Sequence, residues 1–106
     1  MNVAIIVVTH SFADKDKKKI IATATLLVEL KFIRGCGACG HIEDVVVDAT
    51  YRGKNLGRRV IDALIERAKE VGCYKVILDC AESNQPFYEK CGLERKEIQM
   101  VRYFLQ

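Results

Sequence analysis

The sequence predicts an α/β domain of the α+β kind, in which helices flank a mixed, mainly antiparallel sheet. Apolar runs rich in β-branched residues recur at 2–9, 20–32, 42–47 and 74–80, and such runs are typical of strands. Residues 56–71 instead place their apolar side chains at helical spacing, and Gly72 follows as the expected stop. The predicted order is β-β-β-α-β-α-β.

Composition limits the number of domains and the kinds of partner. The chain has 106 residues, of which 50% are hydrophobic and 29% charged, so we expect one domain over residues 1–106. The net charge of +3 is small and dispersed, which gives no argument for a nucleic-acid partner. The apolar runs are too short to cross a bilayer, and the first residues lack the pattern of a leader. We therefore expect a cytoplasmic protein with no membrane partner.

The five cysteines stand at positions 36, 39, 73, 80 and 91. Cys36 and Cys39 have the spacing of a metal knuckle, but no second cysteine or histidine pair lies at the distance that a zinc ribbon or finger needs. Cys73, Cys80 and Cys91 lie on or beside apolar segments, as small core residues do. We expect reduced thiols and no metal.

The first part of the chain reads as a hairpin. Residues 2–9 are apolar without alternation, which indicates a strand buried on both faces. Residues 14–19, DKDKKK, are either a solvated hairpin tip or a binding patch, and the hairpin tip is favoured. Residues 20–32 form the second strand, and the glycine-rich residues 33–40 form a loop.

The last part combines a strand, a short helix and a further strand. Residues 74–80 indicate a buried strand with Asp79 near its end. Ser83 or Asn84 is a candidate cap for a helix that runs through Cys91, with Pro86 in its first turn. Residues 93–105 are predicted to be a last strand or strand pair, whose apolar end favours a partner.

The stretch at 40–59 organises the chain, because a strand there leads into a basic loop and then into a helix N-terminus. The unpaired N–H groups of a first helical turn and the positive end of the helix dipole attract phosphate. Arg52, Lys54, Arg58 and Arg59 add positive charge around these donors. The spacing alone fits a phosphate site and a solvated basic turn equally well.

Two motifs resemble the GNAT superfamily of acetyl-CoA-dependent N-acetyltransferases. Arg52-Gly53-Lys54-Asn55-Leu56-Gly57 is similar to the family's Arg/Gln-x-x-Gly-x-Gly/Ala loop, with Asn55 in place of the middle glycine. Asn84 and Phe87-Tyr88-Glu89-Lys90-Cys91-Gly92 fit the family's Asn-x-x-Phe-Tyr-x-x-x-Gly stretch.

A narrower resemblance is to the glucosamine 6-phosphate N-acetyltransferase subfamily. It rests on blocks at 40–47, 51–54, 73–80 and 87–92 and covers nearly the whole chain. It implies acetylation of glucosamine 6-phosphate in a ternary complex with acetyl-CoA, on the way to UDP-N-acetylglucosamine. Family members begin with a further strand and one or two helices, and Met1 here directly precedes what looks like their second strand, so we expect these elements to be missing.

The resemblance implies a role for each site residue. Backbone groups of Val45–Val47 would pair with the pantetheine arm, and the 52–58 loop would take the pyrophosphate. Tyr88 would protonate the departing thiolate. The alternative is a tyrosine that packs in a helix with its hydroxyl exposed to solvent. The residues implied to hold acetyl-CoA are Val45, Val46, Val47, Arg52, Gly53, Lys54, Asn55, Leu56, Gly57, Arg58, Asn84 and Tyr88.

The implied acceptor site combines acids and cations. Glu43 and Asp44 would contact sugar hydroxyls or the amine, although adjacent residues on a strand point to opposite faces. Asp79 would orient the amine, or else it pairs with Lys75 or caps a helix. The residues implied to bind the phosphosugar are Lys31, Arg34, Glu43, Asp44, Val45 and Arg102.

Family members are dimers whose last strands interlock, so the resemblance implies a homodimer. Two alternatives remain open at this point. One is a GNAT enzyme that acts on another amine, and the other is a catalytically silent module that binds acetyl-CoA or dimerises.

Overall fold

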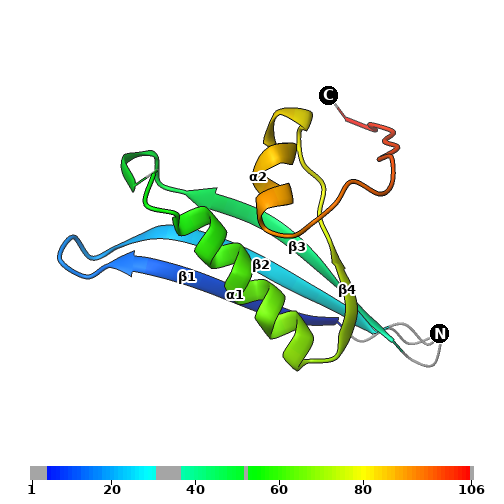
Figure 1. Cartoon of the computed structure of the whole chain (residues 1–106), viewed down its shortest axis with the longest axis horizontal. Helices are drawn as coiled ribbons and strands as arrows, with labels where there is room; N and C mark the ends of the chain where they lie inside the picture. Colours follow the sequence, from blue (N-terminus) through cyan, green and yellow to red (C-terminus); the bar gives the residue numbers. More distant parts are fainter. Residues whose placement is uncertain (1–4, 31–36, 52, 106) are drawn as a thin grey trace.

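The structure, a computed structural model, describes residues 5–30, 37–51 and 53–105 (Figure 1). Four strands form one sheet in the order β1-β2-β3-β4. They are β1 (Ile5–Asp14), β2 (Lys19–Leu30), β3 (Ala38–Val47) and β4 (Cys73–Ile77). β2 pairs antiparallel with both β1 and β3, whereas β3 and β4 pair parallel. The prediction of a mixed, mainly antiparallel sheet is confirmed.

The two α-helices are α1 (Leu56–Glu70) and α2 (Gln85–Lys90). Short 3₁₀ helices, η1 (Ala49–Tyr51) and η2 (Glu82–Asn84), precede them. α1 ends one residue before the predicted Val71, and Gly72 follows with a φ of 88°, which favours glycine. It makes the crossover that the parallel β3–β4 pair requires.

The core lies between α1 and one face of the sheet (Figure 1). Val60, Ile61 and Leu64 of α1 have no exposed surface, and neither do Leu26 and Val28 of β2. Close packing against α1 therefore fixes the middle of the sheet more firmly than its edges.

Two strands that were predicted to be buried lie at the edges of this sheet. Ile5 and Val7 of β1 are each 60% exposed, and Tyr74 of β4 is 53% exposed. An apolar run without alternation suggested burial on both faces, but each strand has a described neighbour on one side only. The hairpin tip is confirmed, since residues 15–18 form a turn in which Asp14 Oδ1 accepts from the N–H groups of Asp16 and Lys17.

The predicted last strand does not form. Residues 93–105 contain no helix or strand, and Ile98, Met100, Phe104 and Leu105 are 78–88% exposed. A strand needs a neighbour to accept and donate its backbone hydrogen bonds, and no described strand of this chain runs beside the segment.

Candidate functional site

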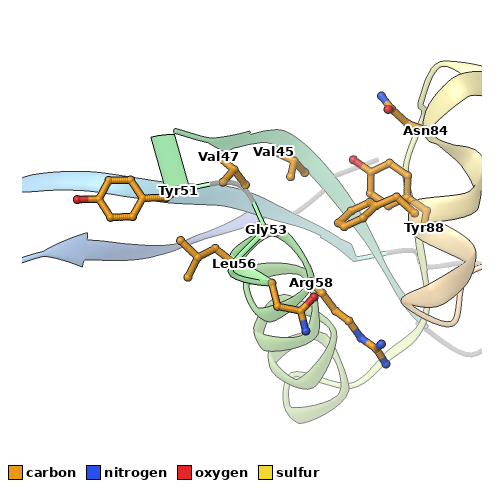
Figure 2. Close-up of a pocket in the computed structure, with 11 residues that line it drawn as sticks. Val45, Val47, Tyr51, Gly53, Leu56, Arg58, Asn84 and Tyr88 are labelled. Atoms are coloured by element: carbon orange, nitrogen blue, oxygen red, sulfur yellow. The ribbon is translucent and has the colours of Figure 1, made fainter. Parts of the chain in front are cut away.

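A pocket of about 420 Å³ lies where β3 extends beyond the end of β4 (Figure 2). Side chains and backbone from β3, the β3–α1 connection, α1 and the η2–α2 segment surround it. The lining residues are Val45, Val47, Tyr51, Gly53, Asn55, Leu56, Gly57, Arg58, Asn84, Phe87 and Tyr88. This list includes nine of the residues predicted to hold acetyl-CoA.

One wall of the pocket is the open end of β3. The pairing of β3 with β4 stops at His41 and Ile77, so the rest of β3 has no partner on that side among the described residues. The β2–β3 register shifts by one residue between Thr23 and Thr25, and Asp44 within this bulge has a φ of 53°. Unpaired backbone groups beside a pocket are able to bind an extended ligand as a further strand would.

A second wall is the N-terminus of α1. Asn55 occupies the N-cap position, yet no side chain caps the helix and its first turn contains no acid. The φ of Asn55 is 62°, a left-handed conformation that glycine and asparagine tolerate best, which explains how asparagine fits at the usual glycine position. With Arg58 beside it, this uncapped end of a 15-residue helix suits an anion.

Gly57 lets this wall approach α2 closely. A Cβ atom at position 57 would lie 3.1 Å from the Phe87 ring and 3.5 Å from Val47 Cγ2. Any larger residue would therefore project between two lining side chains. The absence of a side chain here leaves room for a ligand to run along the helix N-terminus.

The third wall comes from η2 and α2, where Asn84 and Tyr88 point toward β3 (Figure 2). Tyr88 packs edge-on against Phe87, with ring centroids 4.9 Å apart. Partial burial, with a smaller contribution from Cys80 and Cys91, raises the pKa of Tyr88. Its hydroxyl therefore stays protonated at neutral pH and is able to donate a proton.

The rim of the pocket is tied to the β1–β2 hairpin through Tyr51. The Tyr51 hydroxyl donates to Asp14, and this hydrogen bond is the main reason that the pKa of Tyr51 is raised to about 12. Asp48 accepts from the hydroxyl and N–H of Thr50 and lies 3.1 Å from Lys19 Nζ, so its pKa is lowered to about 2. These contacts hold the β3–α1 connection against the hairpin.

The predicted acids lie outside the pocket lining. Glu43 and Asp44 are both exposed, and the bulge interrupts the regular alternation on which their expected opposite orientation depended. Asp79 follows the end of β4 and is exposed, with no ion pair or hydrogen bond to the described residues. The expected Lys75 pairing and capping role for Asp79 are therefore both absent from this part of the chain.

Of the predicted phosphate-binding cations, Arg102 is among the described residues, and it does not line the pocket. Arg102 is exposed, and its guanidinium carbon lies 5.8 Å from the centroid of the Phe104 ring. Lys31 and Arg34 lie outside the described residues, and so does Arg52 of the predicted cofactor loop.

Val46 is 57% exposed and does not line the pocket, as alternation with Val45 and Val47 requires. Lys54 is also absent from the lining.

Two lining residues, Tyr51 and Phe87, were not predicted as site residues. Both belong to blocks that carry the family resemblance, so a signal was present in the sequence. Their positions at the pocket depend on the packing of the hairpin and of α2, which spacing along one segment does not reveal.

The cysteines differ in exposure. Cys39 is buried, Cys73 and Cys91 are half-buried, Cys80 is exposed, and all four are free thiols. Burial raises the pKa values of Cys73 and Cys91. Cys36 lies outside the described residues, and the described residues hold no group of three or more metal-binding side chains.

None of the described helices has the length and hydropathy of a membrane span.

Residues 6–93 match the acetyltransferase (GNAT) family, and the chain belongs to this family. It is 57% identical over 86 residues to a glucosamine 6-phosphate N-acetyltransferase from Arabidopsis thaliana, an alignment that covers 81% of this chain and 58% of the relative. It is 59% identical over 90 residues to glucosamine 6-phosphate N-acetyltransferase 1 from Dictyostelium discoideum, covering 85% of this chain and 57% of that relative. The chain thus spans less than two thirds of the length of these curated relatives.

The fold agrees with this assignment. The crystal structure of the Arabidopsis thaliana glucosamine-6-phosphate N-acetyltransferase superposes with a TM-score of 0.89 at 51% identity. The superposition covers 92% of this chain and 67% of that one.

Proposed function

We propose that this chain transfers the acetyl group of acetyl-CoA to the amine of glucosamine 6-phosphate. The observation that carries the proposal is the pocket itself, in which an open strand edge, an uncapped helix N-terminus and a protonated tyrosine meet. The names of relatives that share half or more of the aligned residues support the choice of acceptor. The product, N-acetylglucosamine 6-phosphate, would supply the synthesis of UDP-N-acetylglucosamine.

Each wall has a separate task in binding acetyl-CoA. The unpaired backbone of Val45–Val47 pairs with the amide groups of the pantetheine arm, as one strand pairs with another. The first turn of α1 donates its N–H groups to the pyrophosphate, with Arg58 beside it and Gly57 leaving the space. Bound acetyl-CoA supplies an activated acyl group, so no metal is needed.

Tyr88 is the residue we assign to proton donation. Its raised pKa keeps the hydroxyl protonated, and its position opposite Val45 puts that hydroxyl near the expected reacting end of the arm (Figure 2). A backbone N–H of β3 near the bulge would stabilise the oxygen that gains negative charge during transfer. Departure of the thiolate is aided when Tyr88 gives up its proton.

The acceptor amine approaches from the side of the β3 bulge. Glu43 and Asp44 are exposed there and are free to contact sugar hydroxyls or the amine through hydrogen bonds. Asp79 follows the end of β4, the strand that pairs with β3, and would orient the amine. Lys31, Arg34 and Arg102 are assigned to the phosphate group, for which arginine offers bidentate hydrogen bonds.

A homodimer in the cytoplasm is the assembly that we propose. Residues 98–105 expose several large apolar side chains, and a second copy of this single 1–106 domain would cover them and offer the missing strand partner. Four free thiols among the described cysteines fit a reducing compartment.

Release of free CoA, measured with and without glucosamine 6-phosphate, tests the proposed function. We expect rapid release only when acetyl-CoA and the phosphosugar are both present. Release with a different amine and not with the phosphosugar would favour another GNAT activity. Tight acetyl-CoA binding without release for any amine would favour the silent module.

A further inference from the structure

The charged β1–β2 hairpin tip approaches the rim of the pocket. Three ammonium groups surround the Tyr51 ring, with Nζ atoms 5.9 Å (Lys17), 5.5 Å (Lys19) and 5.3 Å (Lys54) from its centroid. Tyr51 itself lines the pocket. The sequence favoured a solvated hairpin tip for residues 14–19. In the structure, lysines of this tip contact the Tyr51 ring, which lines the pocket where we expect a phosphate-bearing ligand.

Three acids, Asp14, Asp16 and Asp48, act electrostatically on the Tyr51 hydroxyl, yet two of the three lysines around the ring form no ion pair with the described residues. Asp48 is occupied by Lys19 at 3.1 Å and by two hydrogen bonds from Thr50. Asp14 accepts from the Tyr51 hydroxyl and from backbone N–H groups of the hairpin turn. Lys17 and Lys54 form no ion pair with the described residues, so both remain available to an external anion.

The direction of the ligand follows from the arrangement of the pocket. Tyr88 lies at one end, near Val45, while Gly53 and Tyr51 lie toward the other (Figure 2). A CoA molecule whose thiol end approaches Tyr88 and whose pyrophosphate meets α1 would leave the pocket on the Tyr51 side. Beyond the pyrophosphate, CoA carries one more phosphate, attached to the 3′-oxygen of its ribose.

We propose that Lys17 and Lys54, gathered on the Tyr51 ring, bind the 3′-phosphate of CoA and make the protein discriminate CoA from dephospho-CoA. This inference rests on the proposed function, because it requires CoA to occupy the pocket. Collecting like charges on one ring is unfavourable by itself, and a phosphate that lies between two ammonium groups relieves the repulsion. The site is exposed, so its contribution to affinity is modest and sensitive to salt.

Calorimetric titration with CoA and with dephospho-CoA tests the proposal on the full chain. We expect dephospho-CoA to bind about fivefold more weakly than CoA at 0.1 M salt or below. Lys17→Glu should weaken CoA binding about tenfold and reduce the difference between the two ligands to less than twofold. Lys15→Glu is the matched control, because it makes the same charge change in the same turn and, among the described residues, the ammonium groups found over the Tyr51 ring are those of Lys17, Lys19 and Lys54. It should preserve most of the fivefold difference.

Four outcomes would overturn the inference. Equal and tight binding of the two ligands by the parent protein would leave the proposed function intact and remove the 3′-phosphate site. The 3′-phosphate site would also be ruled out if Lys17→Glu kept the difference in affinity between the two ligands. It would be ruled out as well if Lys15→Glu abolished this difference to the same extent as Lys17→Glu. Failure of both ligands to bind would remove the proposed function as well.

Discussion

Replacement of Gly57 separates ligand binding from folding more clearly than any other change in the pocket. A Cβ atom at this position would lie 3.1 Å from the Phe87 ring, a few tenths of an ångström inside the preferred carbon–carbon separation. Phe87 is 37% exposed on a six-residue helix, so its ring has room to move. The steric cost to folding should therefore be small.

Gly57→Glu should also favour the helix. Replacing glycine near the start of α1 removes an unfavourable helix residue, and a carboxylate in the first turn gains about 0.3–1 kcal/mol from the helix dipole. The first turn at present contains no acid that would already make this interaction. We expect the melting temperature to stay the same or to rise slightly.

The same carboxylate should oppose acetyl-CoA. It competes with the pyrophosphate for the N–H groups of α1, and its bulk projects between Phe87 and Val47. Affinity should fall at least tenfold, which is about 1.4 kcal/mol. Gly57→Ala should give a smaller loss, because it adds bulk without charge.

Calorimetric titration of acetyl-CoA into both variants checks this prediction. Lys69→Gln serves as the control, since it changes the net charge by the same amount at the other end of α1. Unchanged affinity in Gly57→Glu would refute the placement of the pyrophosphate. Loss of affinity together with a large fall in melting temperature would show that Gly57 serves the fold and not the ligand.

Three further predictions concern catalysis, acid stability and the core. Tyr88→Phe should keep acetyl-CoA affinity but lower kcat on the order of 10²-fold, and the parent kcat should show no alkaline loss from Tyr88 until pH exceeds the ordinary tyrosine value of 10.0. Equal turnover in parent and variant would exclude Tyr88 as the donor. The stabilisation that Asp48 provides should be complete above pH 3.8 and disappear as pH falls toward 2, because folding lowers its pKa. Urea midpoints of the parent and Asp48→Asn should therefore converge at the acid end, and a gap that widens there would contradict this. Leu64→Ala, at a side chain with no exposed surface, should cost about 2–5 kcal/mol in urea unfolding. A loss below 1 kcal/mol would mean that the α1–sheet interface is not the core.

The elements that could be predicted from the sequence are those whose residue pattern lies within one continuous segment. The helical spacing and the following Gly72 located α1 to within one residue, and the basic loop offered an anion site as one of two equal interpretations before any family was considered. Nine of the predicted cofactor residues line one pocket, and their exact roles stay predictions.

Features that depend on contacts between residues far apart in the sequence could not be predicted from such local patterns. Burial of β1 and β4 was overestimated because an apolar run does not reveal that its strand lies at an edge. The bulge at Asp44 arises from a register shift between β2 and β3, which no spacing within β3 encodes. Tyr51 is held beside the pocket by its hydrogen bond to Asp14 and by packing against Ile21 and Ala22, residues of the hairpin that are far away in the sequence.

The substrate preference is the most direct test of the central claim. Acetylation of glucosamine 6-phosphate and of glucosamine should be compared by kcat/KM on the same preparation. The phosphate is expected to make at least one charge-assisted contact, whose loss costs about 1.5–3 kcal/mol, so glucosamine should be poorer by roughly 10- to 100-fold. Equal values for the two sugars, or acetylation of neither, would contradict the assignment of this chain as a phosphosugar acetyltransferase.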